Sequence, residues 1–194
     1  MDHFRTFMNM MLVALFVMLF ASCNLEYQNA NFKLEIAPNG SGQVEIFFRD
    51  IGSVSSDDKE RKKDVAILRS IAVDDKYIAE AAKHNVKILK RSLSYTSYSV
   101  GLLLAAESND YKNLFEILSP LYKFKRTKTK IYIIPVNQSI IRANVAEPGK
   151  LVKHKGEIAF RWPAKDAKIL SFTSEYTTKG DSFRKDLQKR FGSE

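Results

Sequence analysis

The chain has 194 residues, with 31 Lys and Arg against 22 Asp and Glu, so its formal net charge is +9. This length is enough for one domain to bury a core without disulfides, and the single cysteine excludes an intramolecular disulfide. The basic balance favours anionic partners.

The first distinctive stretch is Met10–Ala21, which contains only uncharged apolar residues. Its length fits the hydrophobic region of a signal peptide and falls short of the roughly 20 residues that cross a bilayer. Ala21 and Ser22 then precede Cys23, the only cysteine. This arrangement resembles the lipobox of bacterial lipoproteins, although Phe20 stands where leucine is most usual. The resemblance implies cleavage before Cys23 and a diacylglyceryl group on its sulfur.

The lipobox also predicts how the chain is divided and where it resides. We expect a signal peptide over residues 1–22, an acylated cysteine and polar tether over 23–30, and one ectodomain over 31–194. The protein would be a lipoprotein of the bacterial cell envelope, held by palmitate-type chains on Cys23. Asn24 is not acidic, which slightly favours the outer membrane over the inner one. The alternatives are an uncleaved anchor and a signal peptide cleaved elsewhere.

Residues 32–48 have the pattern of a β-hairpin, because apolar and polar residues alternate on both sides of a turn. Asn39-Gly40 supplies the positive φ angles that a tight turn needs. A strand follows these glycines where a phosphate-binding loop would need a helix, so we exclude such a loop. The apolar residues of the two strands are Phe32, Leu34, Ile36, Val44, Ile46 and Phe48.

Capping residues predict three helices. The first begins near Asp57, the second begins at Asp74 or Asp75 and ends at Asn85 in a left-handed conformation, and the third begins at Asp110. The apolar residues expected on their buried faces are Val65, Leu68 and Ile71, then Ile78, Ala81 and Ala82, and finally Tyr111, Leu114, Phe115 and Leu118.

Strands are predicted for most of the remaining chain. Val86–Tyr95 and Tyr98–Glu107 form a second hairpin, and Leu103 makes its second strand apolar on both faces, which favours an interior place in the sheet. Tyr122–Ile134 is expected as one long strand. Three later strands carry Ile141, Ala143 and Val145, then Ile158, Phe160 and Trp162, and then Leu170, Phe172, Ser174 and Tyr176.

A C-terminal helix is expected after Asp181 or Ser182, with Phe183, Leu187 and Phe191 along one side. Such a helix either covers an edge of the core, which we favour, or lies in a membrane interface.

These patterns predict an α+β fold in which short helices pack on one face of antiparallel-rich sheets. Between Asp75 and Ile134 the order helix, strand, strand, helix, strand resembles that of a BON-type module (αββαβ). With the lipobox, the hairpin over 36–44 and the motif over 148–162, the chain looks like the LppM-like lipoprotein ectodomains. That resemblance implies a binding or envelope role, toward glycolipids among other ligands, and carries over no catalytic residues.

The sequence offers little for catalysis or metal binding. Outside the signal there are two histidines, His84 and His154, each beside lysine and, we expect, without a carboxylate to orient it. Two distant histidines are too few for a zinc site, and no calcium loop is present. Glu157 and Glu175 could form a carboxylate pair for sugar hydrolysis, but both lie at ordinary polar strand positions. We therefore expect no catalytic residues, no metal and no cofactor.

The most informative charged feature is the basic segment over residues 123–130. If this segment is one strand, Arg126, Lys128 and Lys130 share one face while Lys123 and Lys125 share the other. Together with lysines of a later turn, it would form a surface for headgroup phosphates. The alternative is an edge strand that lysines protect against pairing with other chains. The candidate residues are Lys123, Lys125, Arg126, Lys128, Lys130, Lys150, Lys153 and Lys155.

The sequence thus predicts a membrane-anchored, non-enzymatic module that binds an anionic envelope lipid or glycolipid. One alternative is a scaffold or assembly subunit that docks an acidic envelope protein, and a third is a cell-wall hydrolase. Nucleic acid is not an expected partner, because little of it is accessible outside the cytoplasm.

Overall fold

The computed structural model describes residues 25–95, 99–119, 121–165, 167–177 and 181–182. Within these residues it is a mixed α+β structure in which every pair of bonded strands is antiparallel. This confirms the α+β class with antiparallel sheets. The signal region and Cys23 lie outside the described residues.

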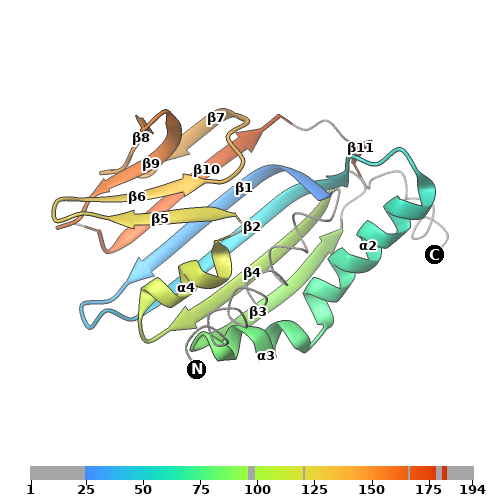
Figure 1. Ribbon diagram of the computed structural model, residues 1–194, viewed down its shortest axis with the longest axis horizontal. Helices are drawn as coiled ribbons and strands as arrows, with labels where there is room; N and C mark the ends of the chain where they lie inside the picture. Colours follow the sequence, from blue (N-terminus) through green and yellow to red (C-terminus); the bar gives the residue numbers. More distant parts are fainter. Residues whose placement is uncertain (1–24, 96–98, 120, 166, 178–180, 183–194) are drawn as a thin grey trace, which may run out of the picture.

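The strands form a large sheet and a smaller second sheet (Figure 1). The large sheet has the order β3-β4-β2-β1-β10-β7, with the short β11 paired to β2. Both predicted hairpins are present, and Leu103 lies on β4, between β3 and β2, as its two apolar faces predicted. The bounds are β1 (Leu25–Ile36), β2 (Gly42–Ser53), β3 (Val86–Tyr95), β4 (Val100–Ser108), β7 (Ile140–Val145), β10 (Ile169–Tyr176) and β11 (Asp181–Ser182).

The turn between β1 and β2 is held by local interactions. Gly40 has the predicted positive φ, at +87°, whereas Asn39 does not have one. The side-chain oxygen of Asn39 instead accepts a hydrogen bond from the backbone N–H of Ser41 at 3.1 Å. Gly42 is needed for packing, because a Cβ there would lie 2.5 Å from the Cβ of Tyr111. At its other end β1 begins at Leu25, so residues 25–30, predicted as a tether, are paired strand.

Three helices cover one half of the large sheet, namely α2 (Asp58–Val73), α3 (Lys76–Lys83) and α4 (Tyr111–Leu118). As predicted, Asp57 caps α2, accepting hydrogen bonds from the backbone N–H groups of Lys59 at 2.8 Å and Glu60 at 2.9 Å. Asp110 caps α4 in the same way, accepting from the N–H of Lys112 at 3.0 Å.

The buried face of α3 differs from the prediction. Tyr77 and Ala81 are buried, whereas Ile78 is 42% exposed. The Tyr77 ring offers more apolar surface than Ile78, and its hydroxyl lies 3.3 Å from the Ser70 hydroxyl of α2. Asn85, at the end of this helix, has the predicted left-handed conformation, with a φ of +56°.

The second sheet has the order β5-β6-β9-β8, and the prediction of one long strand over 122–134 is wrong. The chain turns at Thr127, whose N–H donates to the carbonyl oxygen of Lys130 at 2.8 Å. In a single strand Phe124 and Ile131 would face opposite sides, and the turn lets both face the core. The bounds are β5 (Tyr122–Arg126), β6 (Lys130–Pro135), β8 (Lys150–His154), where a turn was expected, and β9 (Glu157–Pro163).

The core lies between one face of the large sheet and its two covers, the helices and the second sheet. Under the second sheet, Phe172 stacks on Phe32 with ring centroids 4.9 Å apart and on Phe160 at 3.8 Å. Leu68 and Leu114 come from the helices and belong to the same buried cluster. The two covers therefore share one hydrophobic core.

Three tyrosines lie in this core near the start of β1. Tyr27 and Tyr176 pack edge to face with ring centroids 5.1 Å apart, and the Tyr176 hydroxyl accepts a hydrogen bond from Ser174 at 3.0 Å. The Tyr122 hydroxyl is buried beside the hydroxyls of Tyr27 and Tyr176. Burial raises the pKa of all three hydroxyls, most strongly at Tyr27 and Tyr122.

The resemblance to a BON-type module stays a prediction, because the elements of the expected unit do not share one sheet. Helix α3, strands β3 and β4, helix α4 and strand β5 follow one another, yet β3 and β4 belong to the large sheet while β5 pairs with β6. At the C-terminus, Asp181 and Ser182 pair with Ser53 and Gly52 of β2. The helix expected after them lies outside the described residues.

Candidate functional site: a basic face on the second sheet

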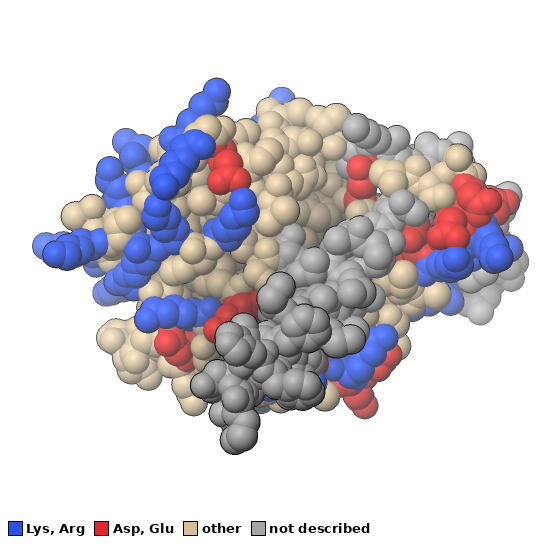
Figure 2. Space-filling model, viewed as in Figure 1, with Lys and Arg blue, Asp and Glu red and all other residues tan. Residues whose placement is uncertain are grey.

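The net charge of the protein is concentrated in one part of the chain. Residues 121–168 contain 12 Lys and Arg against three Asp and Glu, whereas the rest of the chain contains 19 of each sign. The segment includes all four strands of the second sheet, in which Glu157 is the only carboxylate. Figure 2 shows the result as a cluster of Lys and Arg over the region where the second sheet lies in Figure 1, while both signs mix over α2.

Strand alternation divides these cations between the two sides of the second sheet. Ile131, Ile133, Phe160 and Trp162 point into the shared core and are at most 1% exposed. Because successive side chains alternate, their neighbours in sequence point outward. The cations on this outer side, which we call the basic face, are Lys123, Lys125, Lys130, Lys150 and Arg161.

The strand register places part of the basic face in one row across the sheet. Lys125 is opposite Tyr132, Tyr132 is opposite Arg161, and Arg161 is opposite Lys150. Tyr132 itself is 8% exposed and packs with Ile134, Ala159 and Val152 in a small apolar cluster separate from the main core. The outer side of the second sheet therefore combines the cations of the basic face with a small apolar cluster around Tyr132.

Few of these cations are neutralised. Lys123 Nζ lies 2.8 Å from Glu157 Oε1, and Lys125 Nζ lies 3.4 Å from Nε2 of His154, whose ring packs on Tyr132 with centroids 4.4 Å apart. The side chains of Lys130, Lys150 and Arg161 make no ion pair or hydrogen bond with other residues in the described part of the chain. Their charges therefore remain available to an anion.

The structure brings only some of the predicted site residues together. Lys123, Lys125, Lys130 and Lys150 lie on the basic face, and Lys128 projects from the turn beside it. The prediction that Arg126 shares a face with Lys128 and Lys130 is wrong.

Arg126 faces the inner side of the second sheet, where its guanidinium donates a hydrogen bond to the Tyr111 hydroxyl at 2.8 Å. Lys153 faces the same side as Phe160 and points away from the basic face. Lys155 lies in the turn between β8 and β9, at the other end of the sheet from Lys128.

Sequence reasoning missed Arg161, which lies between Tyr132 and Lys150 in the row. The sequence did contain the evidence, because Phe160 and Trp162 alternate toward the core, which implies that Arg161 points outward.

β5 is an edge strand of the second sheet, so the topology is also compatible with the alternative that its lysines protect the edge against pairing with other chains.

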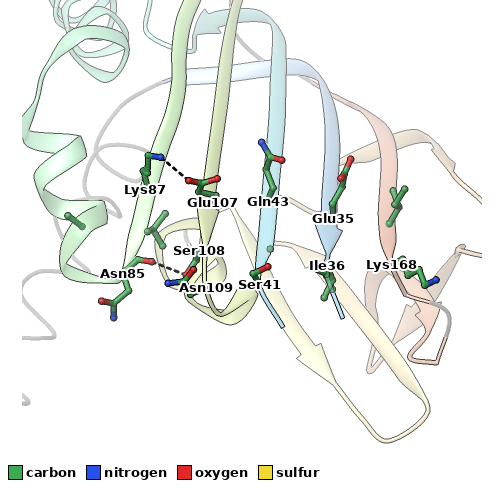
Figure 3. Close-up of a pocket in the computed structure, with 15 residues that line it drawn as sticks. Glu35, Ile36, Ser41, Gln43, Asn85, Lys87, Glu107, Ser108, Asn109 and Lys168 are labelled. Carbon is green, nitrogen blue, oxygen red and sulfur yellow. Dashed lines mark hydrogen bonds and ion pairs between the residues drawn. The ribbon is translucent and has the colours of Figure 1, made fainter. Parts of the chain in front are cut away.

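A groove of about 800 Å³ opens at one end of the large sheet (Figure 3). Its labelled residues come from β1, β2, β3, β4 and the adjoining loops, and one oppositely charged pair among them is in contact, with Lys87 Nζ 3.0 Å from Glu107 Oε1. The Ser108 hydroxyl donates a hydrogen bond to the Asn85 carbonyl oxygen at 2.8 Å. Among the described residues that line this groove there is no histidine that could act as a base for Ser108.

The remaining candidates for chemistry are separated in space. The expectation that His84 lacks a carboxylate partner is wrong, because its Nδ1 lies 2.8 Å from Glu116 Oε2. Glu157 and Glu175 lie on different sheets. No group of three or more His, Cys, Asp or Glu in the described residues could hold a metal ion.

The chain matches no family model, no curated protein and no solved structure. The resemblance to LppM-like ectodomains therefore stays a prediction. None of the described helices combines the length and the hydrophobicity that a membrane crossing requires.

Proposed function

We propose that this protein is a lipid-anchored lipoprotein of the bacterial envelope whose basic face binds an anionic lipid or glycolipid headgroup. The observation that supports the proposal most strongly is the segregation of charge, because residues 121–168 have an excess of nine positive charges and the rest of the chain is neutral. Lys130, Lys150 and Arg161 have no carboxylate partner in the described part of the chain. Each cation near an anionic membrane contributes on the order of 1 kcal/mol.

The short distance between the lipobox and the fold favours contact with a bilayer. Leu25, two residues after Cys23, is already part of β1, and two extended residues reach at most about 7 Å. β1 then runs for 12 residues, about 40 Å, toward the end of the molecule where the β5–β6 turn lies (Figure 1). An anchor on Cys23 and the basic face would therefore meet one bilayer when the long axis lies along its surface.

Flotation with vesicles tests the proposal. The chain from residue 24 onward, which contains every described element and lacks the acylation site, is mixed with vesicles of phosphatidylcholine alone or with 30% phosphatidylglycerol added. We expect binding only to the anionic vesicles. The variant Lys125→Gln/Lys150→Gln/Arg161→Gln removes three charges, so its affinity should fall about 150-fold, corresponding to about 3 kcal/mol.

The matched control removes three exposed cations of the helical half and β3 with the variant Lys59→Gln/Lys62→Gln/Lys90→Gln. It has the same net charge, and its affinity should change less than threefold. Equal binding to both kinds of vesicle, or equal losses in the two variants, would refute the proposal. Binding to an acidic protein without binding to anionic vesicles would favour the scaffold alternative.

A further inference from the structure

The row across the basic face has an arrangement that charge alone does not require. Its members are a lysine (Lys125), an aromatic ring with a hydroxyl (Tyr132), an arginine (Arg161) and a lysine (Lys150) on four adjacent strands. With strands about 4.8 Å apart, the Cα atoms of Arg161 and Lys150 lie about 5 Å apart, and those of Lys125 and Arg161 lie about 10 Å apart, on either side of Tyr132.

Like charges directly opposite each other on neighbouring strands destabilise a sheet. Arg161 and Lys150 form such a pair, and no carboxylate among the described residues bonds to either of them. An anion between them would remove the repulsion and accept hydrogen bonds from both, and the planar guanidinium favours a phosphate in particular.

A second cationic position lies on the other side of Tyr132. Lys125 flanks the ring directly, and Lys130 is its diagonal neighbour, two residues before Tyr132 on β6. The only side-chain partner of Lys125 in the described part of the chain is the imidazole of His154, which supplies no formal negative charge. The face thus has two cationic positions separated by one aromatic ring.

We infer that the basic face is a subsite for a headgroup that carries two phosphate groups about 10 Å apart. One phosphate binds between Arg161 and Lys150, the other binds to Lys125 and Lys130, and the connecting part of the headgroup lies over Tyr132. This inference rests on the proposed function and specifies its ligand class.

Two soluble sugar phosphates test this spacing without a membrane. The full chain, purified in a nonionic detergent, is titrated by calorimetry with fructose 1,6-bisphosphate and with fructose 6-phosphate at the same ionic strength. We expect the bisphosphate to bind at least tenfold more tightly. Lys125→Gln should abolish that difference and leave the affinity for the monophosphate within twofold, whereas Arg161→Gln should weaken both.

Lys153→Gln is the matched control, because it removes the same charge from a neighbouring residue that points away from the basic face. It should leave both affinities within twofold. Equal affinities for the two sugar phosphates, absence of binding to either, or equal effects of Lys125→Gln and Lys153→Gln would overturn the two-phosphate subsite. Retained flotation on anionic vesicles in those cases would leave the proposed function standing, whereas loss of flotation would refute both.

Discussion

The helices and the second sheet cover the same face of the large sheet, but they differ in how many acidic residues accompany their cations. On the helices, acids are interspersed with the cations and some lysines pair with them, as in Lys63 with Glu60 at 2.6 Å and Lys83 with Glu80 at 2.8 Å. On the second sheet, seven Lys and Arg share the strands with Glu157 alone. Both covers bury apolar side chains against one core, so packing does not explain the difference.

What the comparison teaches is that the basic face is not a requirement of the fold. Exposed ion pairs contribute little to stability, so the fold would allow either cover to have a net charge of zero with little change in the free energy of unfolding. Keeping Arg161 opposite Lys150 without an acid instead costs stability. Unpaired like charges that lower the stability of the folded protein are typical of a binding site for an oppositely charged ligand.

The largest expected effect tests whether the two covers form one cooperative unit. Phe172→Ala removes a ring under the second sheet, and Leu114→Ala removes a side chain under the helices. We expect losses of about 3–5 kcal/mol and about 2–5 kcal/mol in the free energy of unfolding, measured by urea denaturation. Each variant should unfold in one transition, and two separate transitions would contradict the shared core.

A smaller loss is expected from a buried polar pair on the helical side. Asp64 of α2 is 3% exposed and accepts a hydrogen bond from the Ser53 hydroxyl at 2.5 Å. Asp64→Ala leaves that hydroxyl without its acceptor, so urea denaturation should show a loss of about 1–3 kcal/mol. Asp64→Asn keeps an acceptor oxygen and should lose less. Equal losses in the two variants would show that the hydrogen bond is not what matters.

The tyrosine cluster beside the second sheet predicts a decrease of stability at alkaline pH. Burial raises the pKa of Tyr27, Tyr122 and Tyr176 above the value of about 10 expected in the unfolded chain. The folded state then holds its protons more tightly, so this contribution is full below about pH 10 and is lost as the pH rises further. Urea denaturation at pH 8 and pH 11 measures the decrease, which should be smaller in Tyr122→Phe. An unchanged decrease in that variant would contradict this assignment.

The smallest effect should have opposite signs in the two regions. Lys150→Gln relieves the repulsion from Arg161 and should raise the free energy of unfolding by about 0.2–1 kcal/mol. Lys63→Gln breaks an exposed ion pair with Glu60 on α2 and should lower it by a similar amount or less. Thermal denaturation at low ionic strength measures both changes. A change of the same sign in the two variants would contradict the claim that the two covers differ in how their charges affect stability.

Much of the fold could be predicted because local chemistry decides it. Asp57 and Asp110 cap their helices, and Gly40 has the positive φ expected at the hairpin turn. The turn at Thr127 was not predicted, because residues 125–130 are all polar. No apolar residue there shows that the buried positions change from even numbers, as at Phe124, to odd numbers, as at Ile131.

The basic face could be predicted only in part, because it depends on pairing between distant strands. The sequence shows that Lys123 and Lys125 point to the same side, but it does not show that Arg161 and Lys150 lie beyond Tyr132 in the same row. That row exists only after β8 and β9 pair, and the residues of β8 were expected to form a turn.

The most direct test of the central claim asks which surface touches the headgroups. In the chain from residue 24 onward, Thr129→Cys or Ala66→Cys supplies the only cysteine, beside the basic face or on α2, for an environment-sensitive fluorophore. On anionic vesicles, we predict that the emission of the label at residue 129 rises and shifts to shorter wavelength, while the label at residue 66 is unchanged. A response at residue 66 alone, or at neither position despite flotation, would contradict the account.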